Sequence, residues 1–326
     1  MEYLLTVITF FPLLAVLLML FIPREEEQTI KRMAVGLSFI PLLLAIYLWL
    51  AYDQAAGGFQ FEHVAEWIPV IKVNYHVGVD GLSVPLIFLT ALLTTLCLIY
   101  SSFTIKTRVK EFFLLFFLLQ MGMFGVFVSL DLVLFYVFWE IGLVPMYLLI
   151  GIWGQAKDRP QYSAIKFFLY TLAGSVFMLL AILALYFTHG TFDIQALSHQ
   201  ELSQVSPLFE GNEWAATLAF WAFFIAFAIK VPLFPFHTWL PDAHTAAPTA
   251  GSVILAGVLL KLGGFGMMRI ALPIFPAQFQ YFCWNIPVIP ILALFSIVYG
   301  ALVCMAQWDL KRLIAYSSVS HMGYFM

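Results

Sequence analysis

The sequence predicts an all-α fold, a polytopic bundle of about ten transmembrane helices. Two observations support this prediction. The 326 residues are 63% hydrophobic and 10% charged, whereas soluble domains carry about 25% charged residues. Apolar runs of about twenty residues, enough to span a bilayer, recur from end to end without alternation. Because backbone groups in lipid must be paired within the membrane, continuous runs indicate helices and not barrel strands.

The helices are expected in order along the chain wherever an apolar run is long enough to cross the bilayer. Their expected positions are residues 3–22, 33–52, 84–103, 112–129, 131–152, 163–188, 214–239, 247–269, 285–306 and from 312 onward. The fifteen residues from 312 to Met326 rise about 22 Å, short of the roughly 30 Å of hydrocarbon. We therefore expect the chain to continue beyond Met326.

The basic residues predict an orientation with the N-terminus outside. If the first helix runs from outside to inside, ten basic residues fall in cytoplasmic segments and two fall outside, as the positive-inside rule requires. The ten are Arg24, Lys31, Arg32, Lys106, Arg108, Lys110, Lys157, Arg159, Lys311 and Arg312. The two are Lys72 and Arg269, and the acidic residues of the outer connections are Asp53, Glu62, Glu66, Asp80, Asp193, Glu201, Glu210 and Glu213.

No residue pattern predicts a cofactor or a metal ion in this chain. The cysteines lie inside apolar helices and are too scattered for a disulfide framework, a zinc site or an iron–sulfur cluster. They are Cys97, Cys283 and Cys304. His237, Asp242 and His244 could suggest a metal site, but their spacing is no known ligand pattern. No glycine-rich loop follows a strand, so nucleotide or flavin binding is not indicated either.

Three lysines and one glutamate lie inside the predicted helices. Lys166 is a few residues into the sixth helix, so its ammonium can snorkel to the cytoplasmic interface. Lys230 and Lys261 lie near the middle of the seventh and eighth helices, where a lysine costs about 2.5–3.5 kcal/mol. Glu140, in the fifth helix, is the candidate partner. Such buried ionisable residues usually mark ion pathways.

A pair of Glu140 and Lys230 has two interpretations. A fixed pair would only hold helices together. In a movable pair, burial favours the neutral form of each group while proximity favours the charged forms. Lys230 would then keep its proton while Glu140 is close and release it when the two separate. Such a pair titrates as one unit.

Two prolines directly after Lys230 predict a broken helix. Pro232 and Pro235 lack an N–H, so carbonyls around residues 228–231 lose their helical partners. Non-helical backbone inside a membrane is tolerated only where protein or water pairs it, and broken helices at mid-membrane are typical of transport sites. An ordinary proline kink is the alternative.

Two histidines extend this polar region. His237 lies between Lys230 and Lys261 in sequence and titrates near neutrality, which suits a proton relay. A capping or hydrogen-bonded role for His237 stays open. His321 lies about nine residues, or roughly 14 Å, into the tenth helix, where a relay and a structural role are equally open. Small residues of the eighth helix allow close packing and leave room for water beside Lys261.

Three long segments carry a family resemblance. They are "FYVFWEIGLVPMYLLIGIWG" at 135–154, "KVPLFPFHTWLPDAHTAAPTAGSVILAGVLLKLGGFG" at 230–266 and "DLKRLIAYSSVSHMG" at 309–323. They resemble the antiporter-like, proton-translocating subunits of respiratory complex I, most closely the M-type subunit, called chain 4 in organelles. The resemblance runs from about residue 75 to the end, while the first 70 residues are similar only in hydropathy.

The resemblance implies roles for particular residues. Glu140 matches the family's glutamate on the fifth helix, Lys230 the lysine of the broken seventh helix, and Lys261 that of the eighth. His237 matches the histidine between these lysines, and Lys166 and His321 fall at further polar-axis positions. The family has about fourteen helices with two inverted five-helix repeats. The chain would comprise three N-terminal helices at 1–110, a first repeat at 111–270 and the start of a second at 271–326.

The resemblance also implies a function. The chain would be a membrane-arm subunit of a proton-translocating NADH:quinone oxidoreductase, with FMN, iron–sulfur clusters and quinone bound in other subunits. Its partners would be other membrane-arm subunits, including homologous antiporter-like ones, together with the lipid bilayer, and no nucleic acid. It would lie in the bacterial inner membrane. The alternatives are a subunit of an Mrp-type sodium/proton antiporter or of a membrane-bound hydrogenase, and a static structural subunit.

Overall fold

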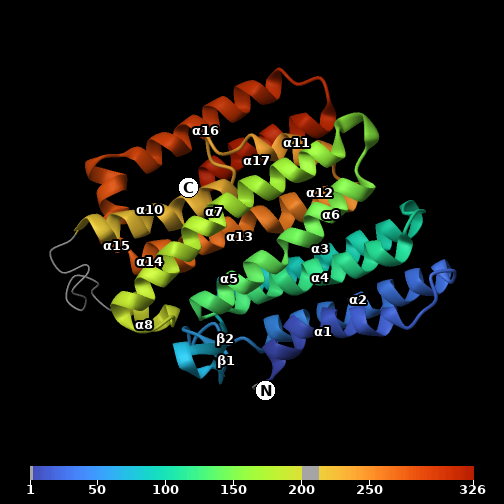
Figure 1. Ribbon diagram of the computed structural model, residues 1–326, viewed down its shortest axis with the longest axis horizontal. Helices are drawn as coiled ribbons and strands as arrows, with labels where there is room; N and C mark the ends of the chain where they lie inside the picture. The colour runs from blue at the N-terminus through green and yellow to red at the C-terminus, as the bar shows by residue number, and fades with distance from the viewer. Residues whose placement is uncertain (1–2, 200–212) are drawn as a thin grey trace.

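The structure, a computed structural model, describes residues 3–199 and 213–326. It is an elongated helix bundle with a β-hairpin at one end (Figure 1). The long helices are α1 (Leu4–Leu20), α2 (Glu27–Ala51), α3 (Ser83–Thr104), α4 (Val109–Val128), α7 (Pro160–His189), α10 (Glu213–Lys230), α16 (Val288–Met305) and α17 (Leu310–Phe325). Each overlaps a predicted helix, which confirms the coarse architecture.

The shorter helices include the pieces of predicted helices that the structure divides. They are α5 (Leu132–Ile141), α6 (Leu143–Trp153), α8 (Ile194–His199), α11 (Trp239–Ala246), α12 (Thr249–Ile254), α13 (Leu260–Gly266), α14 (Leu272–Ile274) and α15 (Pro276–Gln280). Counting continuous segments such as Leu132–Trp153 and Thr249–Ile274 as one, the described chain has seven helices long and apolar enough to cross a membrane. Two shorter apolar helices, Leu4–Leu20 and Trp214–Lys230, accompany them. The predicted count of ten stays a prediction.

The prediction of a purely α-helical fold is wrong in one segment. Strands β1 (Gln60–Ile68) and β2 (Val73–Val79) form an antiparallel hairpin within the predicted outer connection, with Ala65 opposite Tyr75. The physical reason is a period-two alternation in "VNYHVGV" that buries Val73, Val77 and Val79 against the bundle. A run of seven residues is too short to cross a bilayer as a helix.

The predicted fifth, seventh and eighth helices are each interrupted. Gly142 separates α5 from α6, and α10 stops at Lys230, earlier than the predicted residue 239. The eighth helix runs from α12 to α14 through two π-helical turns, Leu255–Leu259 and Met267–Ala271. Such π turns inside helices are often found at functional sites.

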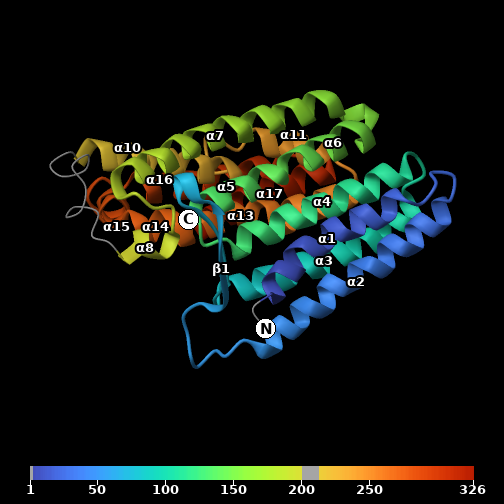
Figure 2. The same cartoon turned by 60° about the horizontal axis from the view of Figure 1, so that its bottom comes forward.

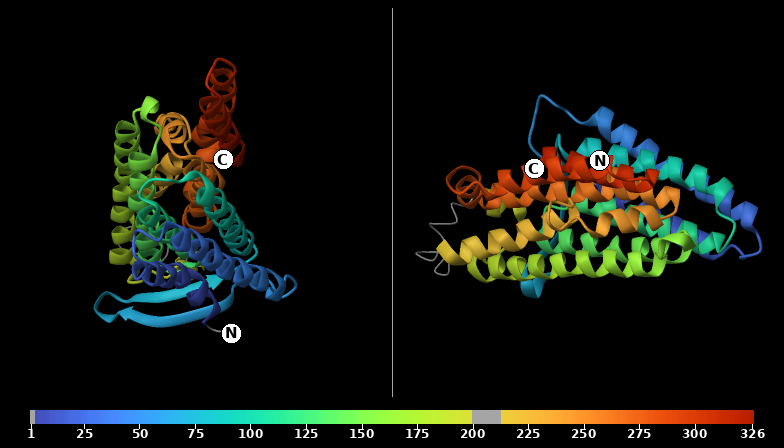
Figure 3. Two further views of the ribbon diagram at one scale, coloured as in Figure 1. Left: turned by 90° about the vertical axis from the view of Figure 1, so that its right-hand side faces the viewer. Right: turned by 90° about the horizontal axis from the view of Figure 1, so that it is seen from above.

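The helices pack in two groups around a central layer. Helix α2 packs on α3 and α1 on α4 at one side, while α16 packs on α17 at the other. Between them lie α5, α10 and α13, with α7 packed on α10 and α6 (Figures 2 and 3). The charged residues predicted for function therefore lie on helices of the centre and of the α17 side.

Lysine side chains pair helix-end carbonyls at one end of the bundle. At the end away from the hairpin, Lys110 donates to the carbonyls of Leu20 and Ile22, and Lys311 donates to those of Thr245 and Ala247. These ammonium groups pair the open carbonyls at the ends of α1 and α11, which favours cations there. The basic residues predicted to be cytoplasmic thus include helix caps.

Of the predicted outer acidic residues, Glu201 and Glu210 lie outside the described residues.

Glycine permits one close approach next to the predicted site. A Cβ on Gly122 of α4 would lie 2.8 Å from the backbone nitrogen of Gly142 and 3.2 Å from the carbonyl oxygen of Phe138. Only a residue without a side chain lets α4 reach the junction of α5 and α6. The interruption two residues after Glu140 is thus packed directly against α4.

Candidate functional site

The broken end of α10 has its backbone largely paired within the protein. The Val231 N–H donates to the Phe227 carbonyl at 2.8 Å, and the Leu233 N–H reaches one residue further back, to Ala228. Pro232 has no N–H for the Ala228 carbonyl, and the Leu233 N–H takes its place. The Ile229 carbonyl thereby loses its helical donor, and it accepts the indole N–H of Trp239 at 2.9 Å. The prediction that protein groups replace the lost helical bonds is confirmed at Ile229.

The side chain of Lys230 lies inside the protein, with 3% of the residue exposed. Its ammonium lies 5.1 Å from the ring centre of Trp139 and 5.9 Å from that of Phe167, which is cation–π range. In the part of the chain that the structure describes, no ion pair of 4.0 Å or less reaches this ammonium. A buried cation is therefore held by aromatic faces and by charge at longer range.

Glu140 supplies that longer-range charge. It lies in the last turn of α5, next to Trp139, and its carboxylate interacts electrostatically with Lys230 without touching it. The Ser175 hydroxyl of α7 faces the same carboxyl. The Oε1 atom of Glu140 is buried and has no hydrogen-bond partner among the described side chains and backbone. The predicted pair is thus brought into one region but stands apart in this structure.

Lys166 forms an ion pair that the sequence did not indicate. Its Nζ lies 2.7 Å from Oδ2 of Asp242 in α11, and Arg312 of α17 lies 3.6 Å from the other oxygen. The three charges join α7, α11 and α17 just beyond the broken helix. The sequence offers Asp242 only as a candidate metal ligand, and no local sequence pattern reveals its partners because they are distant in sequence.

His237 lies in the segment between α10 and α11 and is 3% exposed. Its ring lies against Tyr299 at 5.0 Å and Phe234 at 5.8 Å between ring centres. Its Nδ1 has no hydrogen-bond partner within residues 3–199 and 213–326. The Phe234 N–H donates to the Ser296 hydroxyl at 2.6 Å, which ties this segment to α16. A hydrogen bond of His237 to the Pro235 backbone keeps the structural role open beside the relay.

Among the described residues, no hydrogen bond or ion pair joins Lys261 or His321 to Glu140 or Lys230. Lys261 is half-buried, and its ammonium donates to the Ala256 carbonyl at 2.6 Å, across the π-helical turn before α13. His321 is on an exposed face of α17. The structure therefore brings Glu140 and Lys230 within electrostatic range of each other without contact, and places the other predicted residues on neighbouring elements.

No metal centre is found across the two described ranges, where no three His, Cys, Asp or Glu residues could hold an ion together. Cys97 is buried, and Cys283 and Cys304 are half-buried, all three as free thiols. His244 of α11 is 6% exposed and both its ring nitrogens are without a hydrogen-bond partner in the described chain.

A second ion pair joins the hairpin to the eighth helix. Arg269, in the π-helical turn before α14, lies 2.5 Å from Oδ1 of Asp80, which follows β2, and 3.2 Å from the Ser83 hydroxyl. The rings of Phe59 and Phe265 lie 4.8 Å and 5.2 Å from its guanidinium carbon. The sequence placed Arg269 at the outer side but did not identify this partner.

These features define a class of protein. A polytopic helix bundle with one proline-broken helix, a lysine buried at the break and a nearby carboxylate is an antiporter-like membrane protein. Residues 129–326 match the family model described as NADH:quinone oxidoreductase/Mrp antiporter, transmembrane. The chain belongs to this family.

Curated relatives and a solved structure agree with this assignment. NADH-quinone oxidoreductase subunit M of Rickettsia conorii is 44% identical over 320 residues, covering 97% of this chain and 62% of the relative. Subunit M of Rhodobacter capsulatus is 46% identical over 332 residues, covering 99% of this chain and 63% of the relative. A chain of respiratory complex I from Thermus thermophilus superposes with a TM-score of 0.82 at 32% identity, over 98% of this chain and 63% of that one. The chain thus spans less than two thirds of these relatives.

Proposed function

We propose that the chain is a membrane-arm subunit of a respiratory NADH:quinone oxidoreductase and carries a proton-translocation path. One observation carries the proposal. The buried Lys230 ammonium and the Glu140 carboxyl stand close enough to interact electrostatically, yet they make no direct contact. We propose that the pair closes and opens. The names of the relatives and the structural likeness to complex I support the same assembly.

Coulomb energy decides whether closing such a pair can move a proton. Two unit charges 4 Å apart interact by about 4 kcal/mol at an effective dielectric constant of about 20. Since about 1.4 kcal/mol is tenfold in an equilibrium, closing the pair changes proton affinity by roughly a thousandfold. That range is large enough to load and unload Lys230 at constant pH. Movement of Glu140, driven by redox chemistry in other subunits, would then power each cycle.

The remaining residues form the proposed route. Lys166, paired with Asp242, lies on the cytoplasmic side of Lys230, and the proton passes from Lys230 by His237 and water toward Lys261. His321 continues the relay on the tenth helix. Histidine suits these steps because it titrates near neutrality.

We also propose how the chain is arranged in its membrane. The N-terminus lies outside a bacterial plasma membrane, and ten helices cross it. Residues 1–110 form the N-terminal helices, 111–270 a first five-helix repeat and 271–326 the start of an inverted second one. The chain carries no redox chemistry itself: FMN, iron–sulfur clusters and quinone are bound by other subunits. Its partners are further membrane-arm subunits, homologous antiporter-like ones among them.

A second candidate is a subunit of an Mrp-type sodium/proton antiporter, since the family description names both. A membrane-bound hydrogenase subunit shares the same site chemistry. Sodium flux driven by a pH gradient favours the Mrp-type function, whereas proton flux that requires NADH oxidation favours the proposed one. A static scaffold is the third possibility.

The decisive experiment is Glu140→Gln in the complete complex, reconstituted in vesicles. We expect NADH-driven proton pumping to fall at least about tenfold, because the neutral side chain removes a charge interaction worth roughly a thousandfold. Assembly and subunit content are measured on the same preparation. Glu111→Gln is the matched control, since Glu111 pairs with Arg24 at the surface.

The outcomes separate the candidates. Lost pumping with intact assembly supports translocation through this chain. Normal pumping by Glu140→Gln contradicts the proposal, and failed assembly indicates a scaffold in which the buried charges are structural.

A further inference from the structure

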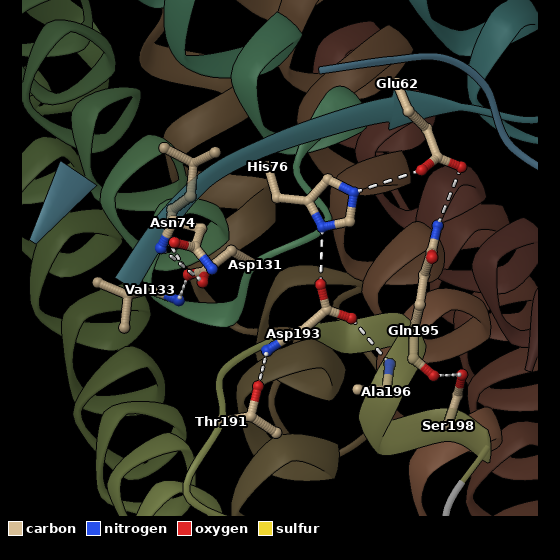
Figure 4. Close-up of polar contacts among 11 residues, drawn as sticks. Glu62, Asn74, His76, Asp131, Val133, Thr191, Asp193, Gln195, Ala196 and Ser198 are labelled. Atoms are coloured by element: carbon tan, nitrogen blue, oxygen red, sulfur yellow. Dashed lines mark hydrogen bonds and ion pairs between the residues drawn. The ribbon is translucent and has the colours of Figure 1, made fainter. Parts of the chain in front are cut away.

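At the hairpin end, a buried histidine lies between two carboxylates that come from different parts of the chain (Figure 4). Nδ1 of His76, in β2, lies 2.7 Å from Oδ2 of Asp193, and Nε2 lies 3.6 Å from Oε2 of Glu62 in β1. His76 is 5% exposed. The Gln195 amide donates to the other Glu62 oxygen at 3.3 Å, which closes a ring of polar contacts.

Backbone hydrogen bonds join the same three segments. The Leu130 N–H donates to the His76 carbonyl at 2.9 Å, and the Ile194 N–H donates to the Leu130 carbonyl at 2.8 Å. The Leu132 N–H, in turn, donates to the Phe192 carbonyl at 2.9 Å. The hairpin, the start of α5 and the segment before α8 are therefore held as one unit at this end of the bundle.

Asp131 fixes the start of α5 within this unit. Its Oδ1 accepts the N–H groups of Val133 and Leu134, and its Oδ2 accepts the Asn74 N–H of β2 at 3.3 Å. From Asp131 a helix rises about 14 Å to Glu140. A shift of the hairpin together with the start of α5 is thus passed along a short helix to Glu140.

The charges of this unit depend on one proton. The groups that face His76 are Asp193 and Glu62, with Asp131 beside Asp193, and all three are acidic. Burial lowers the pKa of His76, but the hydrogen bonds and charges of Asp193 and Glu62 outweigh it and raise the pKa above its ordinary value of 6.5. In the described chain no other ion pair reaches Asp193 or Glu62. Without the proton on His76, like charges are left facing one another.

The ion pair of His76 with Asp193 stabilises this unit over a limited pH range. A raised histidine pKa in the closed unit means that its contribution is complete below about pH 6.5 and is lost as pH rises through the raised value. The pKa of Asp193, raised by burial but lowered more by His76 and the Ala196 N–H, lies below 3.8. The ion pair is therefore complete between these two limits, and its upper limit lies above the ordinary histidine pKa of 6.5.

We propose that His76 is a positioning residue whose protonation closes a clasp between the hairpin and Asp193, and so fixes α5 and Glu140. Rising pH on this face opens the clasp and loosens the coupling of Glu140 to Lys230. The link to pumping rests on the proposed function, whereas the clasp itself does not.

The clasp is tested by amide hydrogen exchange of the complete complex from pH 6 to pH 9, corrected for intrinsic exchange. We expect amides of β2, of 129–134 and of 191–198 to lose protection as pH rises. Each unit by which the closed-state pKa of His76 exceeds the open-state value gives about a tenfold change in opening. His76→Gln should show no such transition. The control His63→Gln, in the same hairpin but with its ring at a tilted angle against Tyr3 and edge-on to Tyr75, should keep it.

A second variant, Asp193→Asn, tests the clasp independently in case His76→Gln does not fold. Asp193→Asn removes one of the facing charges, so the transition should move to lower pH. A transition that is absent from the wild type, that persists in His76→Gln, or that does not move in Asp193→Asn overturns the clasp.

The functional arm measures protons pumped per NADH in vesicles while the pH on the hairpin face is varied. The wild-type ratio should fall at least twofold across the transition, and that of His76→Gln should stay constant. If Glu140→Gln pumps normally, the proposed function is contradicted. The clasp is then judged only by the amide hydrogen exchange measurements. If Glu140→Gln stops pumping but the wild type and His76→Gln share one pH profile, the positioning role fails alone.

Discussion

Replacing Gly263 by alanine tests whether the close contact of α13 with α10 positions Lys230. Gly263 faces the last turn of α10. A Cβ at this position would lie 2.9 Å from the Phe227 carbonyl oxygen, 2.9 Å from the Val231 nitrogen and 2.9 Å from Val231 Cγ2. Two of these atoms belong to the backbone, so no side-chain rotation can relieve the contact. The helices must separate by roughly half an ångström to reach ordinary van der Waals distance.

The alanine substitution has two opposite effects on the free energy of unfolding. Overpacking of this kind costs about 1–3 kcal/mol, while alanine in a helix gains about 1 kcal/mol over glycine. We expect a net loss of stability of up to about 2 kcal/mol. Because Val231 adjoins Lys230, the same displacement moves its ammonium relative to Glu140, and misplacement of reacting groups by about 1 Å costs up to a hundredfold in rate.

The assay compares Gly263→Ala with Gly36→Ala in the purified complex. An added Cβ on Gly36, in α2, meets nothing within 4 Å, so this control receives only the helix gain. Residual activity after heating and NADH-driven pumping are measured for both. Equal heat resistance and equal pumping in the two variants would refute the reasoning, since the contact would then carry neither stability nor position.

Two further predictions concern the buried charges. Lys230→Met should abolish pumping and leave the complex about as stable, because an apolar chain of similar size replaces a buried cation that makes no ion pair of 4.0 Å or less in the described chain, and the buried Glu140 can take up a proton. Heat inactivation and pumping check this, and a marked loss of stability would contradict it. Asp80→Asn should destabilise the complex by up to about 3 kcal/mol, because it leaves the 9% exposed Arg269 without its anion. Burial raises the pKa of Asp80, but Arg269 lowers it more, to below 3.8. The wild-type contribution is therefore present above pH 3.8 and lost as pH falls below it. Heat-inactivation profiles from pH 3 to pH 7 should converge at the acid end, and parallel profiles would argue against the ion pair.

The prediction of the site was best where the signal is local. Lys230, Pro232 and Pro235 follow one another in sequence, and the observed helix stops at Lys230. The contact partners of the predicted residues were not predictable. Lys166 pairs with Asp242, 76 residues away, and Lys261 turns back to the Ala256 carbonyl of its own helix. Which groups pair depends on how the helices rotate and pack, and the hydropathy of the sequence does not determine either.

The hairpin shows the same limit for the fold. Its alternating residues are visible in the sequence, but a search for apolar runs of membrane length passes over strands of nine and seven residues. Its burial comes from the bundle end on which it lies.

The amino-acid sequence by itself determined the membrane helix bundle, the broken seventh helix and the family, because each depends on composition or on residues adjacent in the chain. Only the tertiary structure decided that Glu140 stands apart from Lys230, and that His76 meets Asp193 across 117 positions. Such contacts depend on how the helices pack to bury their surface. That packing decides which groups lie near each charged side chain.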